Sequence, residues 1–334
     1  MVLEIGKLDS DLLRKIVFDN ITFKRKEVLQ RPGIGEDCAV VDFGDYECVM
    51  STDPITGAVE DIGKLAINIT MNDIASNGVE PLGILLAVML PYGTTEKDVE
   101  ALMRQAGEEA ALRGIEIIGG HTEITDAVNR PVIVSTALGR CKAGKSVNSK
   151  NIKVGDKILV SNELGLEGIG ILSNERKEKL QGLLSPEELS LAQSFIHRTS
   201  VVKEGILAGS VGVDGMHDIT EGGLLGAVWE MCQTSGLGAE IFYDRLPLPE
   251  VSRKICEILE IDLLRLISSG SMLIVAEPGK SRLLTEQAAA EGIVISEIGE
   301  ITEKGRILVR EGQRLEIAPP AADELYRGLR AEWK

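Results

Sequence analysis

Acidic side chains recur where predicted strands and helices of this chain end, and their chemistry suits a divalent cation. Asp37, Asp53 and Asp73 lie in the first half of the chain, and Asp218 and Glu221 lie in the second. Carboxylates that gather around one site repel one another, so they must be neutralised by cations, and Mg²⁺ bridged to phosphate groups is the usual solution. We expect a metal–phosphate site; unrelated surface loops are the alternative interpretation.

Asp73 belongs to a segment, 61–77, whose apolar residues recur at the spacing of a core-facing helix: Ile62, Leu65, Ala66 and Ile69. Asn77-Gly78 is a good stop, because glycine accepts the left-handed conformation that closes a helix. Asp73 falls on or beside the apolar stripe, where burying an unpartnered carboxylate is costly. The sequence therefore predicts that Asp73 meets a cation, a metal or strong donors; an aspartate that reaches water near the helix end is the alternative.

A second row on this helix, and a glycine pair farther along the chain, suit contacts with phosphate. Lys64, Asn68 and Asn72 follow one another at i, i+4 and i+8, and a lysine in this row can touch a phosphate oxygen directly. The run Gly-Gly-His-Thr-Glu at 119–123 follows a predicted strand, and two glycines at a strand end let a ligand or another backbone approach closely. The chain has no Gly-x-x-x-x-Gly-Lys-Ser/Thr loop, so any nucleotide is bound in another way.

The elements predicted around these residues place the polar side chains at element ends. A strand at 47–51 ends before Asp53, and a strand at 115–118 ends before the glycine pair. A strand at 213–217 leads into a loop that opens a helix, with Asp218 or Thr220 at the helix N-terminus, where anions and capping oxygens are favoured.

Length and patterning predict two domains. A chain of 334 residues is long for a single core, and strands and helices are mixed in both of its halves. The polar segment 142–153 is the candidate boundary. We therefore predict an α/β (α+β) fold with domains at 1–150 and 151–334.

Composition argues against several classes of protein. The formal net charge is -16, from 52 acidic against 36 basic residues, and nucleic-acid binding needs a basic face; a nucleotide held through metal ions is still compatible. Dispersed cysteines without a Cys-x-x-Cys pair indicate reduced thiols and argue against a zinc site. The charged N-terminus is not that of a signal peptide, and the longest apolar run, 82–90, is too short to span a bilayer, so we expect a cytoplasmic protein.

Several motifs occur in the order that is found in one superfamily: Gly33-Ile-Gly-Glu-Asp-Cys-Ala-Val40, Ser51-Thr-Asp53, Asp61-Ile-Gly-Lys-Leu-Ala66, Met71-Asn-Asp73, Gly119-Gly120-x-Thr122 and Met216-His-Asp-Ile-Thr-Glu-Gly-Gly223. Through them the chain resembles the aminoimidazole ribonucleotide synthetase (PurM-like) superfamily over nearly its whole length. This superfamily also contains thiamine-monophosphate kinase, selenophosphate synthetase and the hydrogenase maturation factor HypE. The chain is most similar to the HypE group, through Asp-Ile-Gly-Lys-Leu-Ala and His-Asp-x-Thr-Glu-Gly-Gly.

The resemblance implies an N-terminal domain that forms a homodimer through its sheet and a C-terminal α/β domain that covers the site. It implies ATP in the cleft, with the phosphates held through Mg²⁺ by Asp37, Asp53, Asp73 and Asp218, and with Lys64 and Asn72 as neighbours. Further cofactor residues that it implies are Gly35, Gly119, Gly120 and Thr122. Phosphoryl transfer to an oxygen of a small-molecule or carrier-bound acceptor would then depend on Asp218, Glu221 and Lys64. The resemblance also implies other maturation proteins as partners.

Two departures from the HypE pattern limit these implications. HypE-type chains end in a tail whose terminal cysteine carries the carbamoyl group, and this sequence has no cysteine after Cys256, so we expect no nitrile synthesis on the protein itself. His121 stands where the superfamily mostly has an acid, so either Glu123 replaces it as a metal ligand or one metal site is lost; an imidazole that merely caps a loop is the bland alternative. The alternative functions are a retired nucleotide-binding scaffold and a small-molecule kinase or synthetase of the same superfamily.

Overall fold

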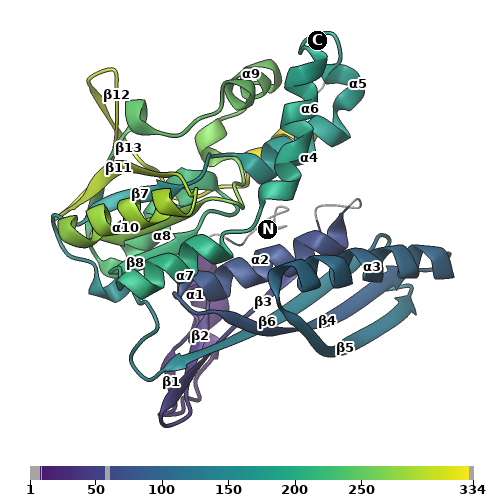
Figure 1. Ribbon diagram of the computed structural model, residues 1–334, viewed down its shortest axis with the longest axis horizontal. Coiled ribbons are helices and arrows are strands. Elements are labelled where there is room, and N and C mark those ends of the chain that lie inside the picture. Colours follow the sequence, from purple (N-terminus) through teal and green to yellow (C-terminus); the bar gives the residue numbers. More distant parts are fainter. Residues whose placement is uncertain (1–7, 9, 57–60, 331–334) are drawn as a thin grey trace.

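The computed structural model describes residues 8, 10–56 and 61–330, in two halves that each contain one β-sheet (Figure 1). The remaining residues, 1–7, 9, 57–60 and 331–334, lie outside this description. They include the start of the predicted first domain and the end of the predicted second domain. The mixed α/β architecture in two parts is the one that the sequence predicts.

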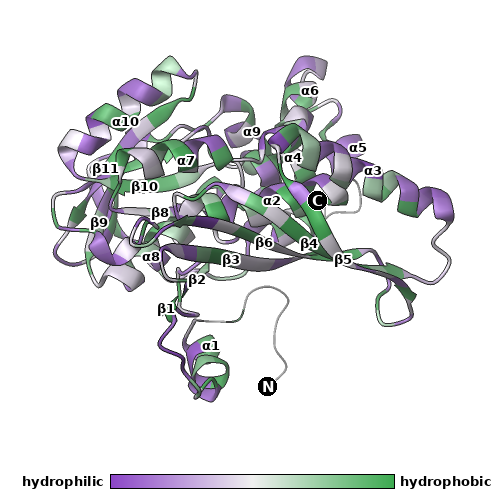
Figure 2. Cartoon of the chain, turned by 60° about the horizontal axis from the view of Figure 1, so that its bottom comes forward, coloured by the Kyte–Doolittle hydropathy of each residue, from purple (hydrophilic) through white to green (hydrophobic). Residues whose placement is uncertain are grey.

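The first half is built on a six-stranded sheet with the order β1-β2-β3-β6-β4-β5. Its strands are β1 (Val28–Gln30), β2 (Ala39–Asp42), β3 (Tyr46–Ile55), β4 (Pro81–Pro91), β5 (Glu116–Thr125) and β6 (Val132–Lys142). Neighbouring strands are antiparallel except β4 and β5, which are parallel. Helices α2 (Ile62–Ser76) and α3 (Glu96–Arg113) pack on one face, whereas α1 (Ser10–Ile16) lies apart from the sheet (Figure 2).

The second half is built on a seven-stranded sheet with the order β13-β12-β9-β11-β7-β10-β8. Its strands are β7 (Lys157–Ser161), β8 (Gly215–Asp218), β9 (Gly238–Phe242), β10 (Met272–Ala276), β11 (Ile295–Thr302), β12 (Arg306–Arg310) and β13 (Gln313–Glu316). The helices of this half are α4 (Leu166–Glu175), α5 (Lys177–Leu180), α6 (Pro186–Ser194), α7 (Val202–Val211), α8 (Gly223–Ser235), α9 (Glu250–Leu259), α10 (Pro278–Ala290) and α11 (Glu324–Arg330). Of the helices in the described ranges, none is long and apolar enough to cross a membrane.

Elements with local sequence signals form where those signals lie. Helix α2 ends at Ser76, and Gly78 just beyond it has a φ of 71°, as expected of the Asn77-Gly78 stop. Helix α3 begins after Thr95, whose hydroxyl accepts a hydrogen bond from the backbone of Asp98 while the Asp98 side chain accepts one in return. These helices start and stop where backbone groups find partners close by in the sequence.

Two strands are longer than predicted, and both corrections concern site residues. Strand β3 pairs with β6 along its whole length and includes Asp53, with Asp53 opposite Ser135, so Asp53 does not lie in a loop. Strand β5 likewise includes the run 119–123, paired with β4 up to Thr125. At Gly120 an added Cβ would lie 2.0 Å from the carbonyl oxygen of Leu86, so this glycine permits a close approach of β4.

The helix after β8 also begins later than predicted. Helix α8 starts at Gly223 with Gly222 as its N-cap residue, and Asp218 is the last residue of β8. Neither Asp218 nor Thr220 therefore caps this helix. Gly222 and Gly223 have φ of 91° and 62°, a conformation that glycine adopts more readily than other residues, which delays the helix start.

Helix α2 lies at the seam between the two halves. It packs on the first sheet and also contacts α7 of the second half. The two helices approach so closely that a Cβ at Gly205 of α7 would lie 2.3 Å from the carbonyl oxygen of Ala75. Asp73, within α2, is consequently held where residues of both halves meet.

Candidate functional site

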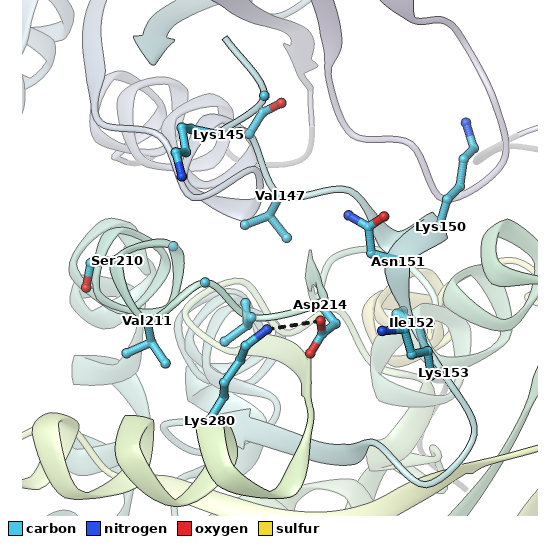
Figure 3. Close-up of a pocket in the computed structure, with 15 residues that line it drawn as sticks. Lys145, Val147, Lys150, Asn151, Ile152, Lys153, Ser210, Val211, Asp214 and Lys280 are labelled. Carbon is cyan, nitrogen blue, oxygen red and sulfur yellow. Dashed lines mark hydrogen bonds and ion pairs between the residues drawn. The ribbon is translucent and has the colours of Figure 1, made fainter. Parts of the chain in front are cut away.

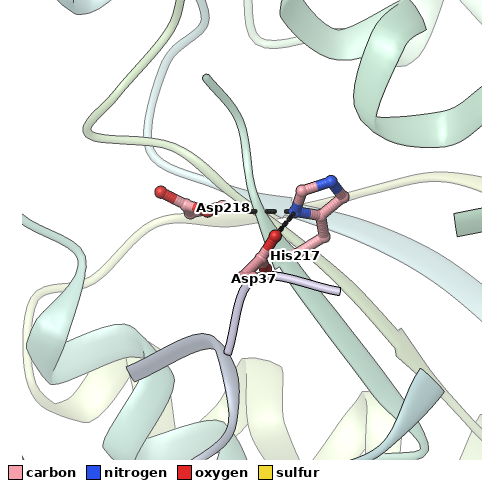
Figure 4. Close-up of side chains that lie close together, drawn as sticks. All are labelled: Asp37, His217 and Asp218. Carbon is pink, nitrogen blue, oxygen red and sulfur yellow. Dashed lines mark ion pairs between the residues drawn. The ribbon is translucent and has the colours of Figure 1, made fainter. Parts of the chain in front are cut away.

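A buried histidine links the two halves at the end of strand β8. Nδ1 of His217 lies 3.0 Å from Oδ1 of Asp37 and 3.8 Å from Oδ1 of Asp218 (Figure 4). The contact with Asp37 is close enough for an ion pair, but its geometry is not that of a hydrogen bond. On its other side the ring lies 2.9 Å from Oε2 of Glu230, measured from Nε2. Burial lowers the pKa of His217, but Asp37 and the other carboxylates outweigh this and hold that pKa well above its usual range.

Asp73 joins this group from helix α2. Its side chain is 7% exposed, and its Oδ2 accepts a 2.5 Å hydrogen bond from the Ser51 hydroxyl. Burial raises the pKa of Asp73 well above its usual range, and the negative charges of Asp218, Asp53 and Asp37 raise it further. The four aspartates predicted to share a site are therefore within electrostatic reach of one another, although the sequence places them in separate elements.

The donor set fits a hard divalent cation. Single ligand atoms of Asp37, His217 and Asp218 lie within 4.8 Å of one another. Oδ2 of Asp218 is buried and has no hydrogen-bond partner among the residues that the structure describes. A buried carboxylate oxygen without a partner is costly, and a bound cation would satisfy it. With Asp53 and Asp73 adjacent, the group can offer several carboxylate oxygens as ligands, and the charged His217 lies beside them without being a ligand.

Lys64 and Asn72, which the resemblance makes neighbours of phosphate, have other contacts in this structure. Nζ of Lys64 lies 2.8 Å from Oδ1 of Asp61. The amide of Asn72 donates to the carbonyl oxygen of Thr199 at 2.7 Å and accepts from the backbone N–H of Val201 at 2.8 Å. Asn72 thus ties α2 to the second half, and Lys64 would have to leave Asp61 to reach a phosphate.

Gly35 lies against helix α8, where its lack of a side chain is needed. Its φ is 73°, and a Cβ there would come within 2.8 Å of the Thr234 hydroxyl and 2.9 Å of the Glu230 carbonyl oxygen. The same hydroxyl donates to the carbonyl oxygen of Ile34 at 2.8 Å. Gly35 therefore lets the loop before Asp37 dock on the helix that carries Glu230.

The run 119–123 is not brought to the aspartate group within this chain. Gly119, Gly120, His121, Thr122 and Glu123 are exposed along β5, which forms the outer edge of the first sheet. Nε2 of His121 lies 3.4 Å from Oε2 of Glu123, so the two side chains face each other. The metal-capable group found in the described part of the chain contains neither of them.

Glu221 contacts the C-terminal segment. Its Oε1 accepts a 2.8 Å hydrogen bond from the hydroxyl of Tyr326, and the next N–H, that of Gly222, donates to Asp323 at 2.7 Å. Near this loop, burial raises the pKa of Glu167 to about 7, and its Oε2 has no hydrogen-bond partner within the described ranges. Glu167 lies in the first turn of helix α4 and is a second buried carboxyl beside the site.

The site predicted from the sequence does not include His217, Glu230 and Glu167. His217 stands inside a motif quoted above, so its position beside Asp218 was the available signal. Glu230 and Glu167 lie on helices of the second half, and only the fold brings them close, so no sequence spacing marks them. Cys38, which follows Asp37, is a buried thiol: it is 3% exposed and its Sγ donates to the carbonyl oxygen of Asp73.

The fold and the site together define a two-domain α/β protein with a buried aspartate–histidine group at the seam of its halves. The family model for the N-terminal domain of AIR synthase related protein matches residues 35–141, and the model for its C-terminal domain matches residues 153–311. The chain belongs to the AIR synthase related protein family. The resemblance inferred from the sequence motifs is thereby confirmed.

Individual relatives point to the hydrogenase maturation branch. The chain is 30% identical over 278 residues to a putative hydrogenase expression/formation protein of Methanocaldococcus jannaschii, covering 80% of this chain and 79% of that protein. It is also 30% identical over 285 residues to carbamoyl dehydratase HypE of Escherichia coli strain K12, covering 82% and 81%. Both similarities extend over about four fifths of each chain.

Solved structures share the fold. The HypE–HypF complex contains a chain that matches with a TM-score of 0.75 at 24% identity, covering 92% of this chain and 99% of that one. A hydrogenase maturation protein HypE in complex with ATP matches with a TM-score of 0.71 at 20% identity, covering 97% of both chains. At these identities the likeness establishes the fold.

Proposed function

We propose that this protein is an Mg²⁺–ATP-dependent enzyme of the HypE type, which transfers a phosphoryl group to an oxygen of a small-molecule or carrier-bound acceptor. The observation that carries the proposal is the buried, unpartnered Oδ2 of Asp218 beside Asp37 and His217, noted among the described residues. A cation at this point supplies the missing partner. The likeness to a HypE chain with bound ATP supports the nucleotide part of the proposal.

In this proposal the residues of the chain have distinct roles. Asp37, Asp53, Asp73 and Asp218 hold Mg²⁺, which when bound neutralises phosphate charge and orients the phosphates. The positively charged His217 offsets part of the carboxylate charge, and Glu230 fixes the orientation of its ring. Positioning and neutralisation are what phosphoryl transfer requires of a protein, so no nucleophile from the chain is needed.

We also propose a homodimer formed through the first sheet. Helices α2 and α3 cover one face of this sheet, and Figure 2 shows hydrophobic colour on the strands around the labels β4 and β5. Exposed apolar side chains on β4 and β5 include Leu82, Leu85, Ile118 and Ile124, which are 39–50% exposed. An apolar sheet face of this kind is typical of a protein interface. Light scattering at micromolar concentration tests it, and a monomer would contradict the dimer.

Partners and compartment belong to the same proposal. One matching chain comes from a complex of HypE with HypF, and we propose that this protein also works with other maturation proteins. Its cysteines, Cys38, Cys48, Cys141, Cys232 and Cys256, are free thiols in the structure, which suits a reducing cytoplasm. The acceptor itself is left to experiment.

Calorimetric titration with a non-hydrolysable ATP analogue, with and without Mg²⁺, tests the site. We expect wild-type binding that requires Mg²⁺, and a loss of at least about tenfold in affinity for Asp218→Asn, because a charged ligand to the metal becomes neutral. Asp126→Asn is the matched control, since Asp126 lies in the exposed turn after β5. ADP release with candidate acceptors then separates an enzyme from a nucleotide-binding scaffold. Unchanged binding by Asp218→Asn would refute the metal–phosphate assignment.

A further inference from the structure

A pocket of about 920 Å³ lies away from the aspartate group, between the segment that joins the two halves and the end of helix α7 (Figure 3). Its walls come from residues 144–147 and 150–153, from residues 209–214 and from Lys280 of α10. Strand β8 separates it from the proposed metal site, because Asp214 precedes this strand and Asp218 ends it. The pocket is thus a second concave site with its own lining.

The lining of this pocket is basic in a protein whose formal net charge is -16. Its charged residues are four lysines and one aspartate: Lys145, Lys150, Lys153, Lys280 and Asp214. An acidic protein repels anions at long range, so a local cluster of ammonium groups creates a distinct place where an anion is favoured.

Two of these lysines already have acidic partners. Nζ of Lys280 lies 3.2 Å from Oδ1 of Asp214, the contact drawn in Figure 3. Nζ of Lys150 lies 3.1 Å from Oε1 of Glu36, and the figure shows Lys150 directed away from the other labelled side chains. Neither ammonium group is therefore the main source of uncompensated charge.

The other two, Lys145 and Lys153, have no ion pair among the residues that the structure describes, and both are exposed. Asp156 accepts a hydrogen bond from the backbone N–H of Lys153 at 2.7 Å, not from its ammonium group. Lys145 comes from the end of the first half and Lys153 from the start of the second. Both residues line the same pocket, so a polyanion that fills it would lie against residues of both halves.

We propose that this pocket binds a small polyanion, a molecule with two or more phosphate or carboxylate groups, through Lys145 and Lys153. Ammonium groups bind such anions through charge-assisted hydrogen bonds, and a concave pocket reduces the exposure of the bound charges to water. The proposal does not depend on the function proposed above, because none of its residues belongs to the aspartate group.

Calorimetric titration of the full chain with inorganic tripolyphosphate in low salt, after divalent cations have been removed on a chelating resin, tests this site. Without divalent cations, the acidic group has nothing to bridge it to phosphate. We expect saturable binding, weakened about tenfold by Lys145→Ala or Lys153→Ala and more by the double variant, because each loses a charge-assisted contact. Lys97→Ala, which removes an exposed lysine of α3, is the matched control and should bind as the wild type does.

Citrate in a second titration distinguishes carboxylates from phosphates as the preferred groups. If one of the two anions binds more tightly and the double variant loses this binding, the result supports the site and shows whether it prefers phosphate or carboxylate groups. Failure of both anions to bind the wild type would overturn the proposal. So would binding that Asp73→Asn abolishes and the lysine variants leave intact, since the anion would then occupy the site between the halves.

Discussion

Nδ1 of His217 and Oδ1 of Asp37 lie 3.0 Å apart, and the two residues come from different halves of the protein. His217 is on β8, next to Asp218, whereas Asp37 precedes β2 in the first half. The pair therefore joins the halves and at the same time places opposite charges inside the candidate site. A histidine with its pKa held well above the usual range carries a positive charge that the carboxylates need.

Removing this imidazole should destabilise the fold. His217→Gln leaves the partly buried carboxylates of Asp37 and Glu230 without the cationic imidazole, and breaking a buried ion pair typically costs about 3 kcal/mol or more. Because the folded-state pKa is raised, the stabilisation by His217 is full below pH of about 6.5 and is lost as the pH rises through the folded value. Urea unfolding at a series of pH values measures this. His197→Gln, at an exposed histidine, should change stability little; an equal effect of both variants would contradict the role of His217.

Asn72 should matter more for the attachment of the two halves than its polar type suggests. Asn72→Ala leaves the carbonyl oxygen of Thr199 and the N–H of Val201 without their partner, and we expect a loss of about 2–4 kcal/mol in the free energy of unfolding. Asn68→Ala, one turn earlier on α2, is the control, because Oδ1 of Asn68 has no hydrogen-bond partner in the described part of the chain. Equal losses for both variants in urea unfolding would argue against this assignment.

The sequence carries the local parts of this structure and misses the parts that depend on distant partners. The end of α2 at Asn77-Gly78 and the capping of α3 by Thr95 follow from neighbouring residues, so they are predictable. Asp53 and Gly120 belong to strands whose length is set by pairing with β6 and β4, which no local pattern records. The residue type of the aspartates was enough to predict that they share a site. The role of His217 depends on its contacts with Asp37 and Glu230, which are distant in the sequence and meet only in the fold.

Gly120 offers a direct test of whether the glycine pair serves the sheet or a ligand. Gly120→Ala places a Cβ 2.0 Å from the carbonyl oxygen of Leu86, so β5 must move away from β4. We expect a loss of at least about 2 kcal/mol in stability, in the range of overpacking effects. Gly107→Ala is the control, because its Cβ meets nothing within 4 Å and alanine favours a helix. A stable Gly120→Ala variant that has lost only nucleotide binding would instead support a ligand role.

Glu167 should make stability fall as the pH rises from acid to neutral. Its carboxyl is 4% exposed, and burial raises its pKa to about 7 from a usual value of 4.5, so the folded state binds its proton more tightly than the unfolded chain does. The stabilisation is therefore full below pH 4.5 and is lost by the time the pH exceeds 7.

Replacing the carboxyl by an amide isolates this effect. Between pH 5 and pH 8, in EDTA, Glu167→Gln should gain about 2 kcal/mol in stability relative to the wild type, the amount that the two pKa values imply. Glu175→Gln, at the exposed end of the same helix α4, should show no such pH-dependent gain. Parallel pH profiles for the wild type and Glu167→Gln would mean that Glu167 is already ionised in the folded protein, with a cation or a water molecule satisfying its Oε2.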